Sequence, residues 1–220
     1  MVNIVVVGSS GHAKVVIDVI EKQAKFSIVG LIDSLKPKGE SCLGYKTLGT
    51  ETDLPLLVEE HSIVGGIVAI GDNWQRHKVV ERISMICPRL RWVTAIHPSV
   101  NLAKAATVGN GTVIMAGASI NSSASIGNCC IINTNSSVDH DNVINDFASL
   151  APGVTIGGKV RIGQFSAISL GANVIHGVSI GVHSIIGAGA TVLNDIPSYS
   201  VALGTPAKVT KKRNEGDKYL

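Results

Sequence analysis

The most regular feature of the chain is an aliphatic residue at every sixth position. From Ile96 to Val192, all seventeen positions of this register hold Ile, Leu or Val. Helices repeat at about 3.6 residues and strands at 2, so neither element alone produces a period of six. An uninterrupted hexapeptide repeat is typical of a parallel β-helix, in which three hexapeptides form one triangular coil. The repeat therefore predicts a narrow prism in which residues 18 positions apart stack.

The residues before the repeat follow a different pattern. Residues 3–8 are an apolar run that ends in glycine, and Phe26–Ile32 form a second apolar run. Apolar residues recur at helical spacing between the two runs. They are Ala13, Val16, Ile17 and Ile20. The order strand, glycine turn, helix, strand predicts a βαβ unit with parallel strands.

The pattern continues with shorter elements up to the start of the repeat. It predicts a loop at 34–50, a helix at Leu54–Glu60, a strand at Ile63–Ile70, a helix from Asp72–Asn73 to about Met85, and a strand at Arg91–Ile96. We expect an α/β domain at 1–94, a β-helix domain at 95–203 and a C-terminal tail at 204–220. The coil register should end at Val192, and the charged tail should be mobile.

Polar clusters follow three of the predicted parallel strands. They are Ser9–His12, Asp33–Ser34 and Gly71–Asn73. The carboxyl ends of these strands should meet at one sheet edge, where open α/β folds bind ligands. Backbone N–H groups of a glycine turn and a helix N-terminus favour an anionic ligand, but the turn lacks the full dinucleotide-binding fingerprint. Each cluster also fits simple turn or capping chemistry, so the prediction of a site depends on their convergence.

Composition narrows the classes of function. Hydrophobic residues make up 45% of the 220 positions and aromatic residues only 4%, which suits a thin-cored solenoid. The net charge of +3, without a basic and aromatic stripe, gives no indication of nucleic-acid binding. We expect no membrane insertion and no signal peptide. The four cysteines lack metal-ligand spacing and fit a reducing cytoplasm.

Several motifs together resemble one known family. GSSGHAKVV at 8–16, the hexapeptides, Asn133–Thr134, the segment 138–141 and GTPAK at 204–208 are similar to bacterial sugar O- and N-acyltransferases of the sialic acid O-acetyltransferase type. Within that family, the chain most resembles enzymes that N-acetylate nucleotide-activated 4-amino-4,6-dideoxy sugars, over residues 3 to about 210. The resemblance implies a Rossmann-like domain that binds the sugar nucleotide and a left-handed β-helix. It also implies a cytoplasmic homotrimer with acetyl-CoA between neighbouring prisms.

The resemblance assigns roles to individual residues. It implies that His140 is the general base and that Asp141 orients its imidazole. The positions that match the sugar-nucleotide site are Ser10, Gly11, His12, Asp33, Ser34, Asp72 and Asn73. The positions that match the acetyl-CoA site are Asn133, Ser149, Gly158, Leu170, Ala188 and Lys208. Ser149 departs from the family, because the most similar enzymes carry a second histidine there. No metal is expected.

Other functions stay open. An O-acetyltransferase acting on sialic acid or another sugar would share the fold, and so would a non-catalytic scaffold that binds a nucleotide sugar without CoA. Some left-handed β-helix trimers are zinc carbonic anhydrases, and His140 and His176 have the spacing of two of their ligands. Gly181 stands at the third ligand position, and a catalytic zinc needs three protein ligands, which disfavours this interpretation. The resemblance leaves open the nucleotide base, the sugar configuration, the acetylated position and the acyl length.

Overall fold

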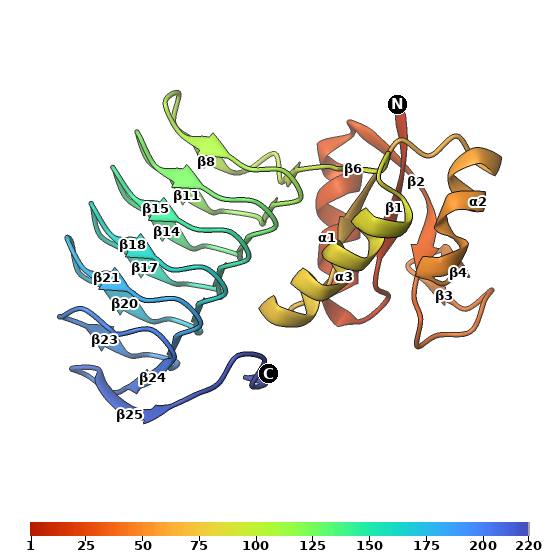
Figure 1. Cartoon of the computed structure of the whole chain (residues 1–220). Helices are drawn as coiled ribbons and strands as arrows, with labels where there is room; N and C mark the ends of the chain where they lie inside the picture. The colour runs from red at the N-terminus through yellow and green to blue at the C-terminus, as the bar shows by residue number, and fades with distance from the viewer. Residues whose placement is uncertain (220) are drawn as a thin grey trace.

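The computed structural model describes residues 1–219, in which an α/β unit lies beside a stack of triangular coils (Figure 1). The six strands of the α/β unit lie in the order β3 (Ser41–Cys42), β4 (Tyr45–Gly49), β2 (Phe26–Ile32), β1 (Val2–Val7), β5 (Gly65–Val68) and β6 (Arg91–Trp92). The helical segments are α1 (Gly11–Gln23), the single 3₁₀ turn η1 (Glu51–Asp53), α2 (Leu54–Glu60) and α3 (Asn73–Ile86). Strand β1 pairs in parallel with both β2 and β5, which confirms the predicted βαβ unit.

Helix α1 lies between the sheet and the coils. All four apolar residues that define its predicted face are buried. Its core cluster includes Ile4 of β1 and also Val113, Met115 and Ile131 of the coils. These three coil residues point away from the prism interior. Side chains that point outward and face solvent would ordinarily be polar. These three are apolar because they pack against α1.

The hexapeptide region forms a prism with three parallel faces, which confirms the predicted β-helix. One face contains β7 (Ala95–Ile96), β10 (Val113–Ile114), β13 (Ile131–Ile132), β16 (Ser149–Leu150), β19 (Ala167–Ile168) and β22 (Ile185–Ile186). The second contains β8 (Asn101–Leu102), β11 (Ser119–Ile120), β14 (Ser137–Val138), β17 (Thr155–Ile156), β20 (Asn173–Val174) and β23 (Thr191–Val192). The third contains β9 (Thr107–Val108), β12 (Ser125–Ile126), β15 (Val143–Ile144), β18 (Arg161–Ile162) and β21 (Ser179–Ile180).

The aliphatic register supplies the interior of this prism. Fourteen of the seventeen positions are buried, and the exceptions Ile96, Leu102 and Val108 belong to the first coil, which has no coil above it. Residues 18 apart pair directly, as Val138 does with Ile156. Each stacked aliphatic side chain that is fully buried contributes roughly 1.5–3 kcal/mol, so the repeat itself stabilises the prism.

One corner of the prism carries a ladder of rings that faces α3. Its members are Phe147, Phe165, His183 and Tyr199, with successive ring centroids 5.5, 4.5 and 5.2 Å apart. Trp74 and His77 of α3 pack edge-on against the ladder, with Trp74 5.2 Å from Phe165 and His77 5.0 Å from Phe147. These contacts fix the start of α3 against three successive coils.

A fully buried arginine completes this attachment. Arg76 of α3 is 1% exposed and forms no salt bridge with any residue in 1–219. Instead, its five N–H groups all donate to oxygen atoms. The acceptors are the carbonyls of Cys129 (2.8 Å), Ile70 (2.9 Å), Gly71 (3.0 Å) and Phe147 (3.0 Å) and the amide oxygen of Asn73 (2.7 Å). The guanidinium therefore holds the Ile70–Gly71 loop onto the coils.

Three sequence predictions for the segments around these cores were wrong. Residues 34–50 are not only loop, because β3 and β4 form a hairpin and β4 joins the sheet beside β2. The strand predicted at Arg91–Ile96 is two strands, because β6 belongs to the sheet and β7 to the prism. The coil does not end at Val192: Ile196 bridges Ile180, and β24 (Ser200–Leu203) pairs in parallel with β22.

The C-terminal tail, which we expected to be mobile, follows a defined path. Strand β25 (Lys208–Lys212) pairs antiparallel with β24, and the chain then returns toward α3 (Figure 1). Arg213 is buried and donates to the carbonyl of His183 (3.2 Å). The Tyr219 hydroxyl accepts a hydrogen bond from the Asn73 N–H (3.1 Å) and donates to the Gly71 carbonyl (3.3 Å). Sequence reasoning missed this path because the segment lies outside the hexapeptide repeat.

Candidate active site

The loops after β1, β2 and β5 meet at the carboxyl edge of the sheet and enclose a cavity of about 570 Å³, which we call the sheet-edge cavity. Strands β2 and β5 flank β1 on opposite sides, so this edge is a topological switch point, where open α/β sheets bind ligands. The lining residues are Val7, Gly8, Ser9, Ser10, Ile32, Asp33, Ser34, Leu35, Glu51, Ile70, Gly71, Gln75, Val79, Arg82 and Lys218. Convergence of the three polar loops was the basis of the predicted site.

Hydrogen bonds hold the loops of this cavity in place. The Ser9 hydroxyl donates to Asp33 (2.6 Å), and the Leu35 N–H donates to the other oxygen of the same carboxylate (2.8 Å). Asp33 thus joins the loops after β1 and β2. Gly8 has φ +105°, and a Cβ there would lie 3.0 Å from the Ala69 carbonyl oxygen, so the turn after β1 requires glycine.

A charged pair forms another part of the wall. The guanidinium of Arg82 donates through two nitrogens to the carboxylate of Glu51, one of these bonds being 2.8 Å long. Glu51 is only 7% exposed, whereas Arg82 extends along the surface. The pairing raises the pKa of Arg82 further above its ordinary value. This part of the wall therefore presents a fixed cation whose charge is partly balanced.

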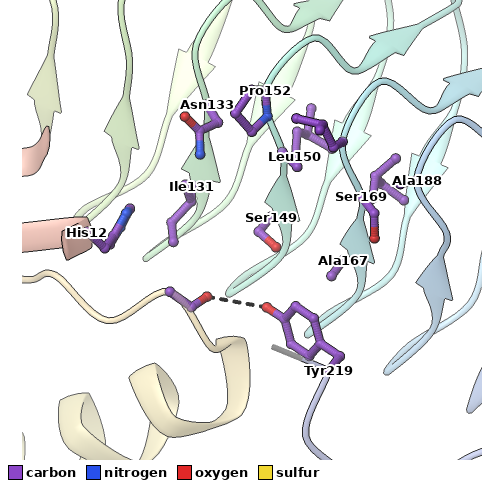
Figure 2. Close-up of a pocket in the computed structure, with 14 residues that line it drawn as sticks. His12, Ile131, Asn133, Ser149, Leu150, Pro152, Ala167, Ser169, Ala188 and Tyr219 are labelled. Carbon is purple, nitrogen blue, oxygen red and sulfur yellow. Dashed lines mark hydrogen bonds between the residues drawn. The ribbon is translucent and has the colours of Figure 1, made fainter. Parts of the chain in front are cut away.

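A second cavity, of about 420 Å³, lies between the α/β unit and the first prism face, and we call it the prism-face cavity (Figure 2). It is lined by His12, Gly71, Ile131, Asn133, Ser149, Leu150, Ala151, Pro152, Ala167, Ile168, Ser169, Leu170, Ala188 and Tyr219. The lining is mainly apolar, with a few convergent polar groups, which is typical of ligand pockets.

The His12 side chain reaches this cavity from the start of α1. Burial, aided by the nearby positive charge of Arg76, lowers the pKa of His12 to about 4, so its imidazole is neutral near pH 7. Its Nε2 atom is buried and has no hydrogen-bond partner among the described residues. A buried polar atom without a partner is costly, and a ligand group in the cavity would satisfy it.

A third group of polar residues lies at a different corner of the prism, between β14 and β15. The Nδ1 atom of His140 is 2.8 Å from an oxygen of Asp141. A carboxylate only accepts hydrogen bonds, so Nδ1 carries the hydrogen and Nε2 is left as a basic lone pair. About half of the His140 side chain is exposed. Its partner Asp141 adopts a left-handed conformation with φ +59°.

The backbone around His140 is fixed by its neighbours. Asp139 accepts hydrogen bonds from the side chain of Asn121 (2.9 Å) and from the N–H of His140 (2.8 Å), and these bonds lower the pKa of Asp139. The Asn142 amide donates to the Asp139 carbonyl (2.9 Å) and accepts from the Val160 N–H (2.6 Å). These bonds fix the backbone that carries the imidazole.

The chain has clear relatives among known proteins. Residues 3–83 match the family described as the PglD N-terminal domain. UDP-N-acetylbacillosamine N-acetyltransferase of Bacillus subtilis (strain 168) is 34% identical over 118 residues, which span about half of each chain, 53% of this one and 52% of the relative. PerB from Caulobacter crescentus, solved in complex with CoA and GDP-perosamine, is 35% identical in sequence to this chain. The two structures superpose with a TM-score of 0.89, over 95% of this chain and 97% of PerB. The chain belongs to the PglD-like sugar N-acetyltransferase family.

Another solved member of the family extends the comparison. The acetyltransferase domain of PglB from Neisseria gonorrhoeae in complex with acetyl-CoA is 30% identical. It superposes with a TM-score of 0.85, over 94% of this chain and 98% of that chain. Coverage of nearly the whole chain includes both the α/β unit and the prism. The Rossmann-like and left-handed β-helix architecture predicted from the sequence is thus the architecture of the PglD-like family.

The structure distributes the predicted site residues of this PglD-like chain over three places. Ser10, Asp33 and Ser34 line the sheet-edge cavity. His12, Asn133, Ser149, Leu170 and Ala188 line the prism-face cavity, so residues predicted for two different ligands meet there. His140, Asp141 and Gly158 lie together at the other prism corner, where Gly158 stacks beneath His140.

The remaining four predicted residues lie in none of these three places. Gly11 is the first residue of α1, and the Asp72 side chain caps α3 by accepting from the Gln75 N–H (2.9 Å). The Asn73 side chain is buried and donates to the Ser166 carbonyl (3.1 Å). Lys208 is exposed on β25. The structure therefore gives Asp72 and Asn73 local structural roles that explain their polar character.

Several lining residues were missed by the sequence analysis. They are Glu51, Gln75 and Arg82 in the sheet-edge cavity, Tyr219 in the prism-face cavity, and Lys218. Gln75 and Arg82 lie in the first and third turns of α3, and the polarity of that helix face was the only feature of the sequence that pointed to them.

Among residues 1–219, no helix is long and apolar enough to cross a bilayer. Within the same range, no three His, Cys, Asp or Glu side chains cluster closely enough to hold a metal ion.

Proposed function

We propose that this protein transfers the acetyl group of acetyl-CoA to the amine of a nucleotide-linked 4-amino-4,6-dideoxy sugar, in the biosynthesis of surface glycans. The single observation that carries the proposal is the His140–Asp141 pair, which leaves an oriented and exposed imidazole nitrogen on a prism of this family. Two solved structures of the Caulobacter crescentus perosamine N-acetyltransferase, with CoA and GDP-perosamine, carry a replaced histidine, which supports a functional histidine in that relative.

In the proposed reaction, the sugar amine attacks the carbonyl carbon of the thioester. A carbon–nitrogen bond forms, the carbon–sulfur bond breaks, and His140 Nε2 accepts the amine proton and passes it to the departing thiolate. Asp141 stabilises the imidazolium that forms transiently. The Ser149 hydroxyl is the proposed donor to the oxyanion, in the place where the most similar enzymes carry a histidine.

Direct attack is favoured over an acyl-enzyme intermediate. Burial raises the pKa of Cys129 to about 11 and that of Cys130 to about 12. Neither thiol therefore supplies a thiolate near neutral pH, and a buried thiol is a poor nucleophile.

We propose that the active enzyme is a homotrimer. Within one chain, His140 lies at the corner between the β14 and β15 faces, whereas the prism-face cavity reaches the corner between the β13 and β14 faces. A neighbouring copy packed alongside would bring its own His140 to that cavity. Acetyl-CoA would then lie between two prisms, and the acceptor sugar would be held by the α/β unit. Because acetyl-CoA supply is cytoplasmic, we place the reaction in the cytoplasm.

The test is thiol release from acetyl-CoA with UDP-, GDP- and dTDP-linked 4-amino-4,6-dideoxy sugars as acceptors. Free sialic acid serves as the acceptor for the O-acetyltransferase alternative. We expect turnover with one nucleotide sugar and a mass increase of one acetyl group on its amine. Turnover with sialic acid alone would replace the proposal by O-acetylation, and nucleotide-sugar binding without thiol release would indicate a non-catalytic scaffold.

A further inference from the structure

The linings of the two cavities share one residue. Gly71 lines both of them, and the consecutive residues Lys218 and Tyr219 divide between them, with Lys218 in the sheet-edge cavity and Tyr219 in the prism-face cavity. Figure 2 shows the Tyr219 ring beside Ser149, with its hydroxyl bonded to the Gly71 carbonyl. A ligand that extends from one cavity into the other past Gly71 would lie beside this dipeptide.

The segment before the dipeptide is held by contacts that order it. Arg213 donates to the Asp217 carbonyl, and its guanidinium lies 5.8 Å from the centre of the Tyr219 ring. The Asn214 N–H donates to the Asp217 carboxylate (2.7 Å), which closes a turn. Gly216, with φ +77°, packs so closely on Trp74 that a Cβ would lie 3.0 Å from the indole. The turn thus rests on α3 and directs Lys218 and Tyr219 toward Gly71.

The chemistry of the dipeptide matches the middle of a nucleotide sugar. A nucleoside bound in the sheet-edge cavity would leave its diphosphate near the exit toward Gly71, where the Lys218 ammonium adds a positive charge. The Tyr219 hydroxyl is held by the Gly71 carbonyl and the Asn73 N–H, and burial raises its pKa, so it remains a neutral phenol. Its ring gives the prism-face cavity a rigid wall near Ser149.

We infer that Lys218 and Tyr219 position the acceptor at the junction of the two cavities. Lys218 binds the diphosphate, and Tyr219 fixes the Gly71 loop and orients the sugar that extends past it. This inference rests on the proposed function, because it requires a nucleotide-linked sugar as acceptor. Tyr219 is a positioning residue: it acts on the sugar through the loop and the cavity wall.

The experiment compares the full chain with Lys218→Met and with Tyr219→Phe. Calorimetric titration uses UDP, GDP and dTDP, and the free nucleosides uridine, guanosine and thymidine. Lys218→Met should weaken binding of the preferred nucleoside diphosphate about 5-fold at low salt, and less at high salt, since an exposed ionic contact contributes about 1 kcal/mol. Binding of the nucleoside alone should stay unchanged. Lys212→Met is the matched control, because Lys212 is an exposed lysine of β25 that lines neither cavity.

Tyr219→Phe removes only the hydroxyl and is tested by steady-state kinetics. The KM for the nucleotide sugar should rise about 3- to 10-fold, because the loop loses the hydroxyl's hydrogen bonds to Gly71 and Asn73, with the KM for acetyl-CoA unchanged. A merely structural defect would change both KM values together. A chain ending at Arg213 should combine the two defects, and if it does not fold the point variants still decide the question.

The outcomes separate this inference from the proposed function. Unchanged diphosphate affinity in Lys218→Met, or equal KM changes for both substrates in Tyr219→Phe, would overturn the positioning role while the acetyltransfer activity persists. If the full chain binds none of the three nucleoside diphosphates, the proposed acceptor class fails, and the inference fails with it.

Discussion

The imidazole of His140 lies directly on Gly158, one coil below it. A Cβ atom built at Gly158 would stand 2.6 Å from Nε2 and 2.7 Å from Cε1 of the ring. That separation is far inside van der Waals contact, so the ring occupies this position only because residue 158 has no side chain. The 18-residue stacking of the prism therefore links the identity of one residue to the placement of the proposed base.

Gly158→Ala should displace the His140 ring without unfolding the prism, because φ at this glycine is not in the left-handed region. We expect kcat to fall about 10- to 100-fold, since a displacement near 1 Å of a catalytic group has effects of this size. Gly177→Ala is the control, because a Cβ there meets nothing within 4 Å, although its φ of +73° costs some stability. Equal activity losses in both variants would contradict the proposed effect of stacking on the base.

His140→Ala should lower kcat by about two orders of magnitude or more, the contribution of a positioned general base, while the oligomer persists. Asp141→Asn should reduce kcat less, about 10-fold, because Nδ1 loses its ionic partner at 2.8 Å but the ring remains. Turnover is measured by thiol release and assembly by light scattering. Near-normal turnover in His140→Ala would sink its assignment as the base.

Burial of neutral His12 should make stability depend on pH. Its pKa is about 4 in the folded state, against an ordinary value of 6.5 for a solvated histidine in the unfolded chain, so below pH 6.5 the unfolded chain binds more protons than the folded one. The contribution of buried, neutral His12 to the free energy of unfolding is complete above pH 6.5 and is lost as the pH falls toward about 4. Between about pH 7.5 and about pH 5, the wild type should lose about 2 kcal/mol more unfolding free energy than His12→Gln. Urea unfolding at the two pH values measures the difference, and parallel losses would show that His12 is not buried as described.

Arg76→Met should strongly destabilise the protein. The five oxygen acceptors of the guanidinium would lose their donors inside the protein, and each unsatisfied buried group is costly. We expect the free energy of unfolding to fall by about 3 kcal/mol or more, whereas Arg89→Met, at an exposed position, should change it by less than about 0.5 kcal/mol. Chemical denaturation of both variants at equal protein concentration provides the test.

The sequence predicted the elements whose residues follow a period. The aliphatic register identified the prism because every coil repeats the same burial requirement, and Ala13, Val16, Ile17 and Ile20 are all buried in α1. The hairpin β3–β4 was missed because its strands are short and Gly44 lies in the turn between them. The coil beyond Val192 was missed because its spacing changes to 16 residues, as in the bridge between Ile180 and Ile196.

The candidate site was predictable only where a motif or a strand end pointed to it. The loops at Ser9–Ser10 and Asp33–Ser34 follow buried strands, and topology alone brings them together. Asn73 shows the limit of this reasoning, because its amide looks like a ligand-binding group in the sequence but bonds to the Arg76 guanidinium and to the Ser166 carbonyl. Tyr219 gave no signal at all, because its role depends on a contact with Gly71 across 148 residues.

That contact has a consequence for the order in which the protein is made. The loop at Gly8–His12 leaves the ribosome early, and the α/β sheet can form while the coils are still being translated. The Gly71 carbonyl receives its bond from Tyr219 only after every coil has been synthesised and stacked, since β25 precedes that residue and pairs with β24. Contacts between residues so distant in sequence form slowly because loop closure comes first. A nascent chain would thus carry an incomplete junction between the two cavities, and the site would mature only after the prism is finished.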